Sequence, residues 1–195
     1  MEQDDRVAIA LARDGDRDAF RALVERNSRT VFRLAYRMTG NEQDAEDVVQ
    51  ETFLRVYRGL RHFEWRSHFG TWLHRIAVNC SLDLVRARQR HEEPPDRESR
   101  EDDHAELAAQ IPGADPTPER VVFSTEVQRK VEEVLAGLSP KEKAAFVLRH
   151  FEGMSIEEIS RIMGIRANAA KNNIFRAVKK LRQELEPLVR STARL

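Results

Sequence analysis

Residues 153–185 read GMSIEEISRIMGIRANAAKNNIFRAVKKLRQEL, and this stretch decides the fold of the C-terminal part of the chain. Ser155 and Glu158 have the spacing of a capping box, in which each side chain accepts a bond from the other residue's backbone N–H at a helix start. Apolar residues at three and four spacing follow, and Gly164 permits a turn. A second helix continues from there, with an inward face made of Ala170, Ile174, Ala177, Val178 and Leu181. The stretch therefore predicts a helix-turn-helix.

The second of these helices is basic and carries adjacent amides. Between 171 and 182 it has no acid, and its bases are Lys171, Arg176, Lys179, Lys180 and Arg182. Asn172 and Asn173 can bond the exposed edge of adenine in the major groove, while Arg and Lys contact phosphates or guanine. We therefore interpret this helix as a DNA reader. Helical hairpins of proteins that never bind DNA share the outline, so an ordinary surface helix stays the alternative.

Composition excludes several classes of protein. The 195 residues include 33 basic and 33 acidic ones, so the net charge says nothing about partners. No apolar run approaches the ~18 residues that cross a bilayer, and the N-terminus is acidic where a secretory signal is basic, so we expect a cytosolic protein. The lone Cys80 excludes an internal disulfide and is expected to be a packed thiol. The histidines lack the spacing of metal ligands, and we expect no metal and no cofactor.

The segment 91–120 separates two helical parts of the chain. Its first part, 91–106, holds eight acids and two bases, a net charge of minus six, and the segment contains five of the seven prolines and no aromatic residue. Such a composition cannot bury enough apolar surface to order itself, so we expect a flexible acidic linker. The sequence thus predicts an all-α protein with one small helical domain at 1–90 and a second, the helix-turn-helix domain, at 121–195.

An amphipathic helix is predicted over 41–60. Its inward stripe contains Ala45, Val48, Val49, Thr52, Phe53, Val56, Tyr57 and Leu60. The opposite face presents Asp47, Gln50, Glu51 and Arg58 around Leu54, which has no place in the inward stripe. A solvated charged face with one stray leucine is the simpler interpretation. A protein-docking face with an apolar centre and a charged rim is the other.

Four aromatic rings gather in ten residues: Phe63, Trp65, Phe69 and Trp72. They lead into a predicted helix over 71–90, whose inward residues are Trp72, Ile76, Ala77 and Leu84 and whose other side carries Arg75, Asn79, Arg86 and Arg90. The basic end of this helix suits the helix dipole and is equally a place to hold phosphates. We expect Trp72 to lie in the core, because a large ring gains most by burial, and we leave Trp65 undecided.

These stretches together resemble the extracytoplasmic-function group of bacterial RNA polymerase sigma factors. DAEDVVQETFLRVYRGL resembles the polymerase-clamp helix of this family, and FGTWLHRIAVN resembles its promoter-melting segment. LSPKEKAAFVLRHFEGMSIEEISRIMGI with KNNIFRAVKKLR resembles its promoter-reading helix-turn-helix. The resemblance covers about residues 16–186, with the motifs in the expected order and spacing.

The resemblance implies a transcription initiation factor without covalent chemistry of its own, expected to serve a stress or envelope-signal response. Core RNA polymerase would dock on a face made of Asp47, Gln50, Glu51 and Leu54. The opened minus-ten strand, with a flipped base, would be held by residues of 63–90, namely Phe63, Ser67, Asn79, Arg86 and Arg90. The upstream minus-thirty-five duplex would be read by Lys171, Asn172, Phe175 and Arg176. Family members are commonly restrained by an anti-sigma factor, often membrane-bound, so such a partner is expected as well.

The chain departs from the family pattern at the reading helix. Arg166 stands where a polar cap residue is usual, so the helix start is expected to shift to Asn168. Asn172 and Asn173 replace a common serine and arginine, which leaves the upstream promoter sequence open. Two other functions compete with the sigma-factor interpretation. A plain helix-turn-helix regulator would lack the docking face around Leu54, and a helical enzyme would need a catalytic arrangement that the sequence does not offer.

Overall fold

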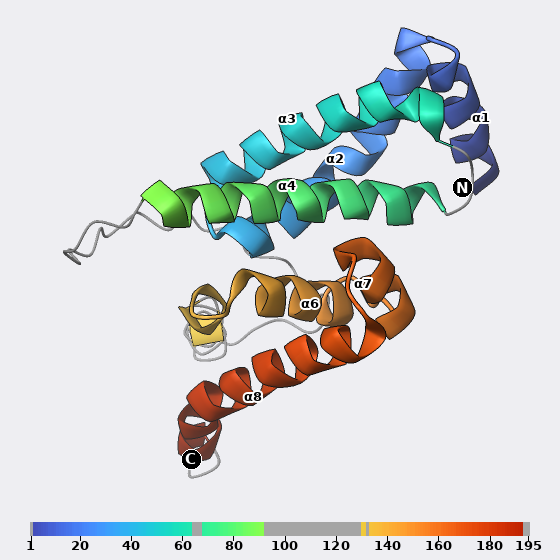
Figure 1. Ribbon diagram of the computed structural model, residues 1–195. Coiled ribbons are helices and arrows are strands. Elements are labelled where there is room, and N and C mark those ends of the chain that lie inside the picture. Colours follow the sequence, from blue (N-terminus) through green and yellow to red (C-terminus); the bar gives the residue numbers. More distant parts are fainter. Residues whose placement is uncertain (1, 64–67, 92–129, 132, 193–195) are drawn as a thin grey trace.

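Helices are the elements throughout the described part of the chain, as the sequence predicts. The computed structural model describes residues 2–63, 68–91, 130, 131 and 133–192. Its elements are α1 (Glu2–Arg13), α2 (Arg17–Thr39), α3 (Glu42–Gly59), the short 3-10 helix η1 (Leu60–His62), α4 (Phe69–His91), α6 (Pro140–His150), α7 (Ile156–Met163) and α8 (Ala167–Thr192) (Figure 1). The predicted linker falls almost wholly in 92–129, outside the described residues.

The N-terminal helices begin and end at residues that satisfy their free backbone groups. Asp16 caps α2, since its Oδ1 accepts from the backbone nitrogens of Asp18 and Ala19, each at 2.9 Å. Gly40 ends α2 with a φ of 87°, a left-handed conformation that glycine adopts without steric cost. Asn41 then caps α3, accepting from the Asp44 nitrogen at 2.8 Å. The chain therefore reverses direction between α2 and α3 within a few residues.

The helix-turn-helix is present, with a second cap that the sequence analysis did not identify. Ser155 and Glu158 form the predicted capping box, with distances of 2.9 Å and 3.2 Å. Ser139 and Glu142 form another one, with Pro140 in the first turn of α6. Gly164 ends α7 with a φ of 64°, so the predicted turn to α8 is confirmed.

Helix α4 lies between the two halves of the molecule (Figure 1). It packs on α2 and α3 on one side and on α6 and α7 on the other. Ala77, Val78, Cys80 and Ser81 are therefore all buried, although they point in different directions around the helix. One hydrophobic cluster joins Val78 of α4 and residues of α2 and α3 to residues of α6 and α7. The halves that the sequence analysis treated as separate thus share a core, and Cys80 is the packed thiol that we expected.

A buried acid connects α6 to α8. Glu142 accepts from Lys180 Nζ of α8 at 2.8 Å and from the Ser139 backbone nitrogen at 3.1 Å. Burial by itself would raise the pKa of Glu142, but the bonds from Lys180 and Ser139 outweigh it and hold the pKa below its ordinary value of 4.5. Because the folded pKa is the lower one, this pair stabilises the fold above about pH 4.5, and the contribution is lost as the pH falls through the folded pKa.

Replacing this acid is expected to destabilise the protein in a pH-dependent way. Glu142→Gln should lower the free energy of unfolding by about 2 kcal/mol at pH 7, because a charge-assisted bond across two helices is lost. The deficit should be smaller at an acidic pH below the folded pKa, where the wild-type carboxyl is protonated as well. Urea unfolding at both pH values measures it, with exposed Glu157→Gln as the matched control. An equal deficit at both pH values would contradict this account.

Candidate functional site

The outer face of α3 carries a straight stripe of exposed side chains. Asp47, Gln50, Leu54 and Tyr57 follow each other at spacings of three, four and three residues and define what we call the outer stripe. Leu54 is 50% exposed and Tyr57 54% exposed, which are large values for apolar and aromatic side chains. The stripe therefore has an apolar end and a polar end, and the structure presents the predicted Asp47, Gln50 and Leu54 together.

Tyr57 corrects one assignment of the sequence analysis. It was placed in the inward stripe, but it lies about 100° around the helix from the fully buried Val56 and so falls at the edge of the packed face. Its ring instead meets the ring of Phe20 from α2, with centroids 5.0 Å apart and planes at 69°. Tyr57 is thus held by one aromatic contact while much of its surface stays open.

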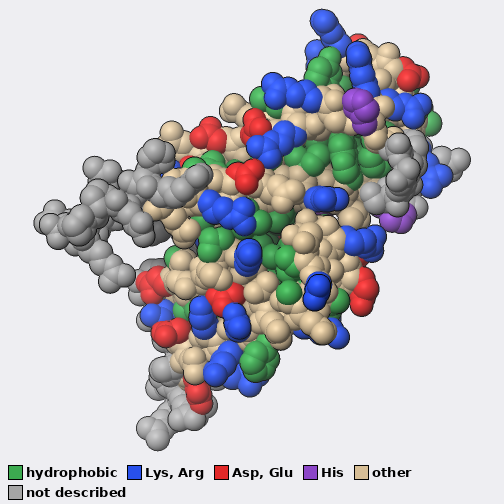
Figure 2. Space-filling view, viewed as in Figure 1, with side chains coloured by type: hydrophobic (Ala, Val, Ile, Leu, Met, Phe, Trp, Pro, Cys, Tyr) green, Lys and Arg blue, Asp and Glu red, His purple; other side chains and the backbone are tan. Residues whose placement is uncertain are grey.

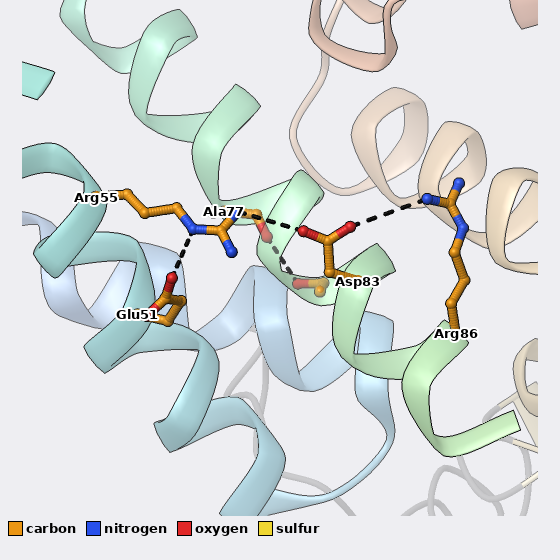
Figure 3. A network of polar contacts seen from close by, with 6 residues as sticks. Glu51, Arg55, Ala77, Asp83 and Arg86 are labelled. Atoms are coloured by element: carbon orange, nitrogen blue, oxygen red, sulfur yellow. Dashed lines mark hydrogen bonds and ion pairs between the residues drawn. The ribbon is translucent and has the colours of Figure 1, made fainter. Parts of the chain in front are cut away.

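Glu51, the fourth predicted docking residue, belongs to a charged network that joins α3 to α4 (Figure 3). Arg55 Nε lies 2.7 Å from Glu51 Oε1, and Arg55 also reaches Asp83 of α4 at 3.3 Å. Figure 3 shows Asp83 between Arg55 and Arg86, and the Arg86 distance is 4.0 Å. The network fixes Glu51 at the rim of the outer stripe, with 43% of its side chain exposed.

The aromatic rings of 63–72 form a packed cluster. Phe63 is only 6% exposed, with its centroid 5.0 Å from that of Trp72 and 5.9 Å from that of Phe69. Trp72 packs against the core, as expected, and leaves little room at Gly59, where an added Cβ would lie 3.1 Å from the Trp72 ring. Phe63 is therefore packed between two other rings in this structure, and its predicted place beside the flipped base stays a prediction.

Some residues predicted near this cluster lie outside the described part of the chain. Ser67 and Trp65 belong to 64–67, and the Arg90 side chain is not described either. Asn79 and Arg86 of α4 are exposed, in line with a role in binding. Arg88 has a different role, since its NH2 group lies 2.8 Å from the buried carboxylate of Asp44 at the start of α3.

Helix α8 turns its predicted readers outward. Lys171, Asn172 and Arg176 are exposed, Phe175 is 68% exposed, and Ala170, Ala177 and Leu181 are buried on the other side. Figure 2 shows several Lys and Arg side chains over this helix. Lys180 is bound to Glu142, so it holds α8 on α6 and adds less to the basic face than its position in the sequence suggests.

The start of α8 differs from our expectation. The helix begins at Ala167, and the Ala170 nitrogen already donates to the Arg166 carbonyl at 3.0 Å. The expected shift to Asn168 is therefore wrong. Helix α7 ends at Gly164, and the short turn that follows places Arg166 directly before the first residue of α8. Asn173 is partly buried, which leaves Asn172 as the fully exposed amide of the two.

Three exposed surfaces carry the described residues that the sequence analysis selected. They are the outer stripe of α3, the α4 side with Asn79, and the basic face of α8. Among the described residues, no group of three or more His, Cys, Asp or Glu side chains is arranged to hold a metal ion. No helix in the described ranges is both long and apolar enough to cross a membrane.

The chain is similar in sequence to known sigma factors. The family described as Sigma-70 region 2 matches residues 23–91, and that described as Sigma-70, region 4 matches residues 128–181. The chain is 37% identical over 163 residues to the ECF RNA polymerase sigma factor SigE of Mycolicibacterium smegmatis, a match over 84% of this chain that spans 60% of that relative's length. It is 31% identical over 188 residues to the ECF RNA polymerase sigma factor SigW of Bacillus subtilis, over 96% of this chain and 100% of the relative.

A solved structure has a similar fold. The structure of CnrH in complex with the cytosolic domain of CnrY matches with a TM-score of 0.65 and 27% identity, over 94% of this chain and 98% of that chain.

The placement of Phe63 predicts a stability effect. Phe63→Ala is expected to lower the free energy of unfolding by about 3 kcal/mol, because it opens a cavity beside Trp72 and Phe69. Phe175→Ala is the matched control, since the same truncation at an exposed position should change stability little. Denaturant unfolding of both variants measures the difference. Equal stability of Phe63→Ala and the wild type would show that Phe63 is not a packing residue.

Proposed function

Because the chain belongs to the extracytoplasmic-function group of RNA polymerase sigma factors, we propose that it binds core RNA polymerase, directs the enzyme to a class of promoters and helps to open the DNA there. One observation carries the proposal. A single chain presents both the outer stripe of α3 and the basic outward face of α8 in a helix-turn-helix. A plain helix-turn-helix regulator would need only the second of these surfaces.

The outer stripe is our proposed polymerase-docking surface. Leu54 supplies the apolar centre, Tyr57 extends it, and Asp47, Gln50 and Glu51 supply a polar rim. Interfaces combine such a core with a charged rim, and exposed aromatic rings are frequent anchors in them. The Arg55 bonds to Glu51 and Asp83 support this assignment, because they hold the rim in place before a partner arrives.

Helix α8 is our proposed reader of the upstream duplex. Asn172 and Arg176 share the outward side of the helix with Phe175, and Lys171 lies at its margin. Asparagine discriminates adenine by two bonds at the base edge, whereas a lysine at the margin of a helix reaches phosphates. Asn172 would therefore contribute selectivity, and Lys171 mainly affinity.

Helix α4 and the residues before it are our proposed site for the opened strand. Asn79 and Arg86 are the described residues that support the assignment, since both are exposed on α4. Ser67 and Arg90 stay part of the proposal from the sequence. Phe63 stays part of it only if the aromatic cluster rearranges on binding, because its ring is packed between Phe69 and Trp72.

The proposal extends to domain organisation and partners. It divides the chain into a domain at 1–90 for polymerase and minus-ten DNA, an acidic linker at 91–120 and a domain at 121–195 for minus-thirty-five DNA. It includes a cytoplasmic location, where polymerase and promoters are, and no cofactor or catalytic chemistry of its own. Since CnrH is bound by the cytosolic domain of another protein, CnrY, we also propose a protein partner for this chain, namely the anti-sigma factor that the resemblance implies, which would hold the chain at the inner membrane face.

The docking surface is tested by charge reversal. The double change Asp47→Lys with Glu51→Lys is expected to abolish both run-off transcription and the retention of the chain by core polymerase. The rim of the outer stripe would then be positively charged and would repel the polymerase surface that the two acids attract. Glu157→Lys with Glu184→Lys makes the same change in net charge on other helices and should keep both activities. Normal retention of the Asp47 and Glu51 variant would refute the docking assignment. No run-off product from any promoter with the wild-type chain would refute the proposed function itself.

Promoter reading is tested by a binding matrix, that is, by the affinity of each variant for minus-thirty-five sequences that differ at one base pair. Asn172→Ala is expected to relax selectivity at one adenine-bearing position of the minus-thirty-five element by ~1–3 kcal/mol, the discrimination of one bidentate contact. Lys171→Ala should instead weaken all sequences alike and lower the salt dependence of binding. Asn173→Ala is the matched control, because it removes the same amide at a half-buried position. A uniformly weaker matrix for Asn172→Ala, with every preference kept, would show that Asn172 does not read a base.

A further inference from the structure

Four side chains of alternating charge link two of the proposed binding surfaces (Figure 3). They are Glu51 and Arg55 of α3 and Asp83 and Arg86 of α4, and we call them the charged network. Arg55 uses two different nitrogens, since its Nε lies 2.7 Å from Glu51 Oε1 and its NH1 lies 3.3 Å from Asp83 Oδ2. Asp83 also uses both of its oxygens, because its Oδ1 lies 4.0 Å from Arg86 NH1. The network therefore connects the rim of the outer stripe to the strand-holding side of α4.

The contacts of the charged network become looser from α3 to α4. The Arg55 bond to Glu51 has the short length of a charge-assisted hydrogen bond. The Arg55 bond to Asp83 is longer, and the 4.0 Å between Asp83 and Arg86 is too long for a hydrogen bond. Arg55 is therefore held mainly by Glu51, and Asp83 is bound less closely to either of these two bases.

The helices beneath the network are fixed, whereas its side chains can move. Thr52 and Val56 of α3 and Ala77 and Cys80 of α4 are buried, so neither helix can shift without disturbing the packed core. The four side chains of the network are, by contrast, between 41% and 56% exposed. A partner that binds at one end of the network can therefore redistribute its contacts by rotation of side chains alone.

Asp83 lies where a carboxylate opposes the proposed DNA contact. It follows Asn79 by four residues and precedes Arg86 by three, so all three lie on one exposed side of α4. The charge of Asp83 repels the phosphates of a strand held by Asn79 and Arg86. It also attracts Arg86, the base that is proposed to bind these phosphates. Arg55, which comes from α3, reduces both effects because its positive charge compensates that of Asp83.

We propose that Arg55 and Asp83 are positioning residues that couple the binding of polymerase to the binding of the opened strand. A basic group of the polymerase that binds Glu51 weakens the bond between Glu51 and Arg55. Arg55 then moves closer to Asp83, and Arg86 turns from Asp83 to the phosphates of the strand. The inference rests on the proposed function, because it takes Glu51 and Arg86 as contacts of polymerase and DNA. Such coupling is reciprocal, so the opened strand must raise the affinity of the chain for polymerase by the same factor.

Two substitutions that break the same ion pair are expected to differ in their effect on DNA binding. Arg55→Gln leaves the charge of Asp83 uncompensated, so the polymerase-bound chain should bind opened DNA about threefold more weakly, a factor within the range of exposed ion pairs. Asp83→Asn removes the repulsion itself, so this variant should bind opened DNA at least as tightly as the wild type. The double variant should bind like Asp83→Asn alone, because Arg55 acts through Asp83.

The measurement is a dissociation constant, taken with the full chain in saturating excess over core polymerase. The probe is a fluorescent promoter fragment that is mismatched at its minus-ten element and comes from a promoter that gives run-off product with the wild-type chain. Arg21→Gln and Asp18→Asn are the matched controls, since they break another exposed ion pair, on α2, and should leave the dissociation constant unchanged. Urea unfolding is expected to show that Arg55→Gln and Asp83→Asn are folded and equally stable. Equal weakening of DNA binding by these two variants would overturn the inference, because a purely structural ion pair gives that result.

The coupling itself is tested by the affinity of the chain for core polymerase with and without the mismatched fragment. The fragment is expected to raise the affinity of the wild-type chain. The factor should be about threefold smaller for Asp83→Asn, in which Arg86 is not drawn to Asp83 before polymerase binds. The same factor for Asp83→Asn and the wild type would overturn the coupling. A wild-type chain that core polymerase does not retain would overturn the proposed function and this inference with it, whereas a retained wild-type chain with either contrary result would overturn this inference alone.

Discussion

Burial of α4 on two sides is the constraint on which the rest of the structure depends. Four residues of one short stretch of α4 are buried, namely Ala77, Val78, Cys80 and Ser81. A helix buries side chains that point in such different directions only when neighbours cover more than one of its sides. The α2 and α3 pair covers one side, and α6 with α7 covers the other. The side of α4 that carries Asn79 and Arg86 is what remains exposed for a partner.

Acids buried near the ends of helices determine how the helices are joined. Asp44 binds Arg88, Glu142 binds Lys180, and Glu152 binds Arg37, and in each pair the partners come from different parts of the chain. A largely buried carboxylate needs such a partner, because desolvation without one is costly. The basic side chains in these pairs are less available to bind nucleic acid. The bases that stay on the outward face of α8 therefore say more about DNA binding than the overall charge does.

Exposed apolar side chains mark the surfaces that the fold does not use for itself. Leu54, Tyr57 and Phe175 are half exposed or more, whereas other leucine and phenylalanine side chains are buried in the core. Leu54 and Tyr57 lie together on α3, and Phe175 lies among bases and amides on α8. Rings and leucines in such settings are typical of protein and nucleic-acid contacts. The two surfaces belong to different halves of the chain.

The sequence by itself determined the all-α fold, the capping box at Ser155, the turn at Gly164 and the outward set on α8, because each depends on spacing within one or two helices. Only the tertiary structure decided that Phe63 is packed, that Tyr57 is exposed and that Lys180 binds Glu142. The contacts of Glu152 with Arg37 and His74 were also decided by the tertiary structure, since Glu152 is far from both in the sequence. Periodicity gives the direction of a side chain around its own helix, whereas burial and pairing depend on which other helix lies there.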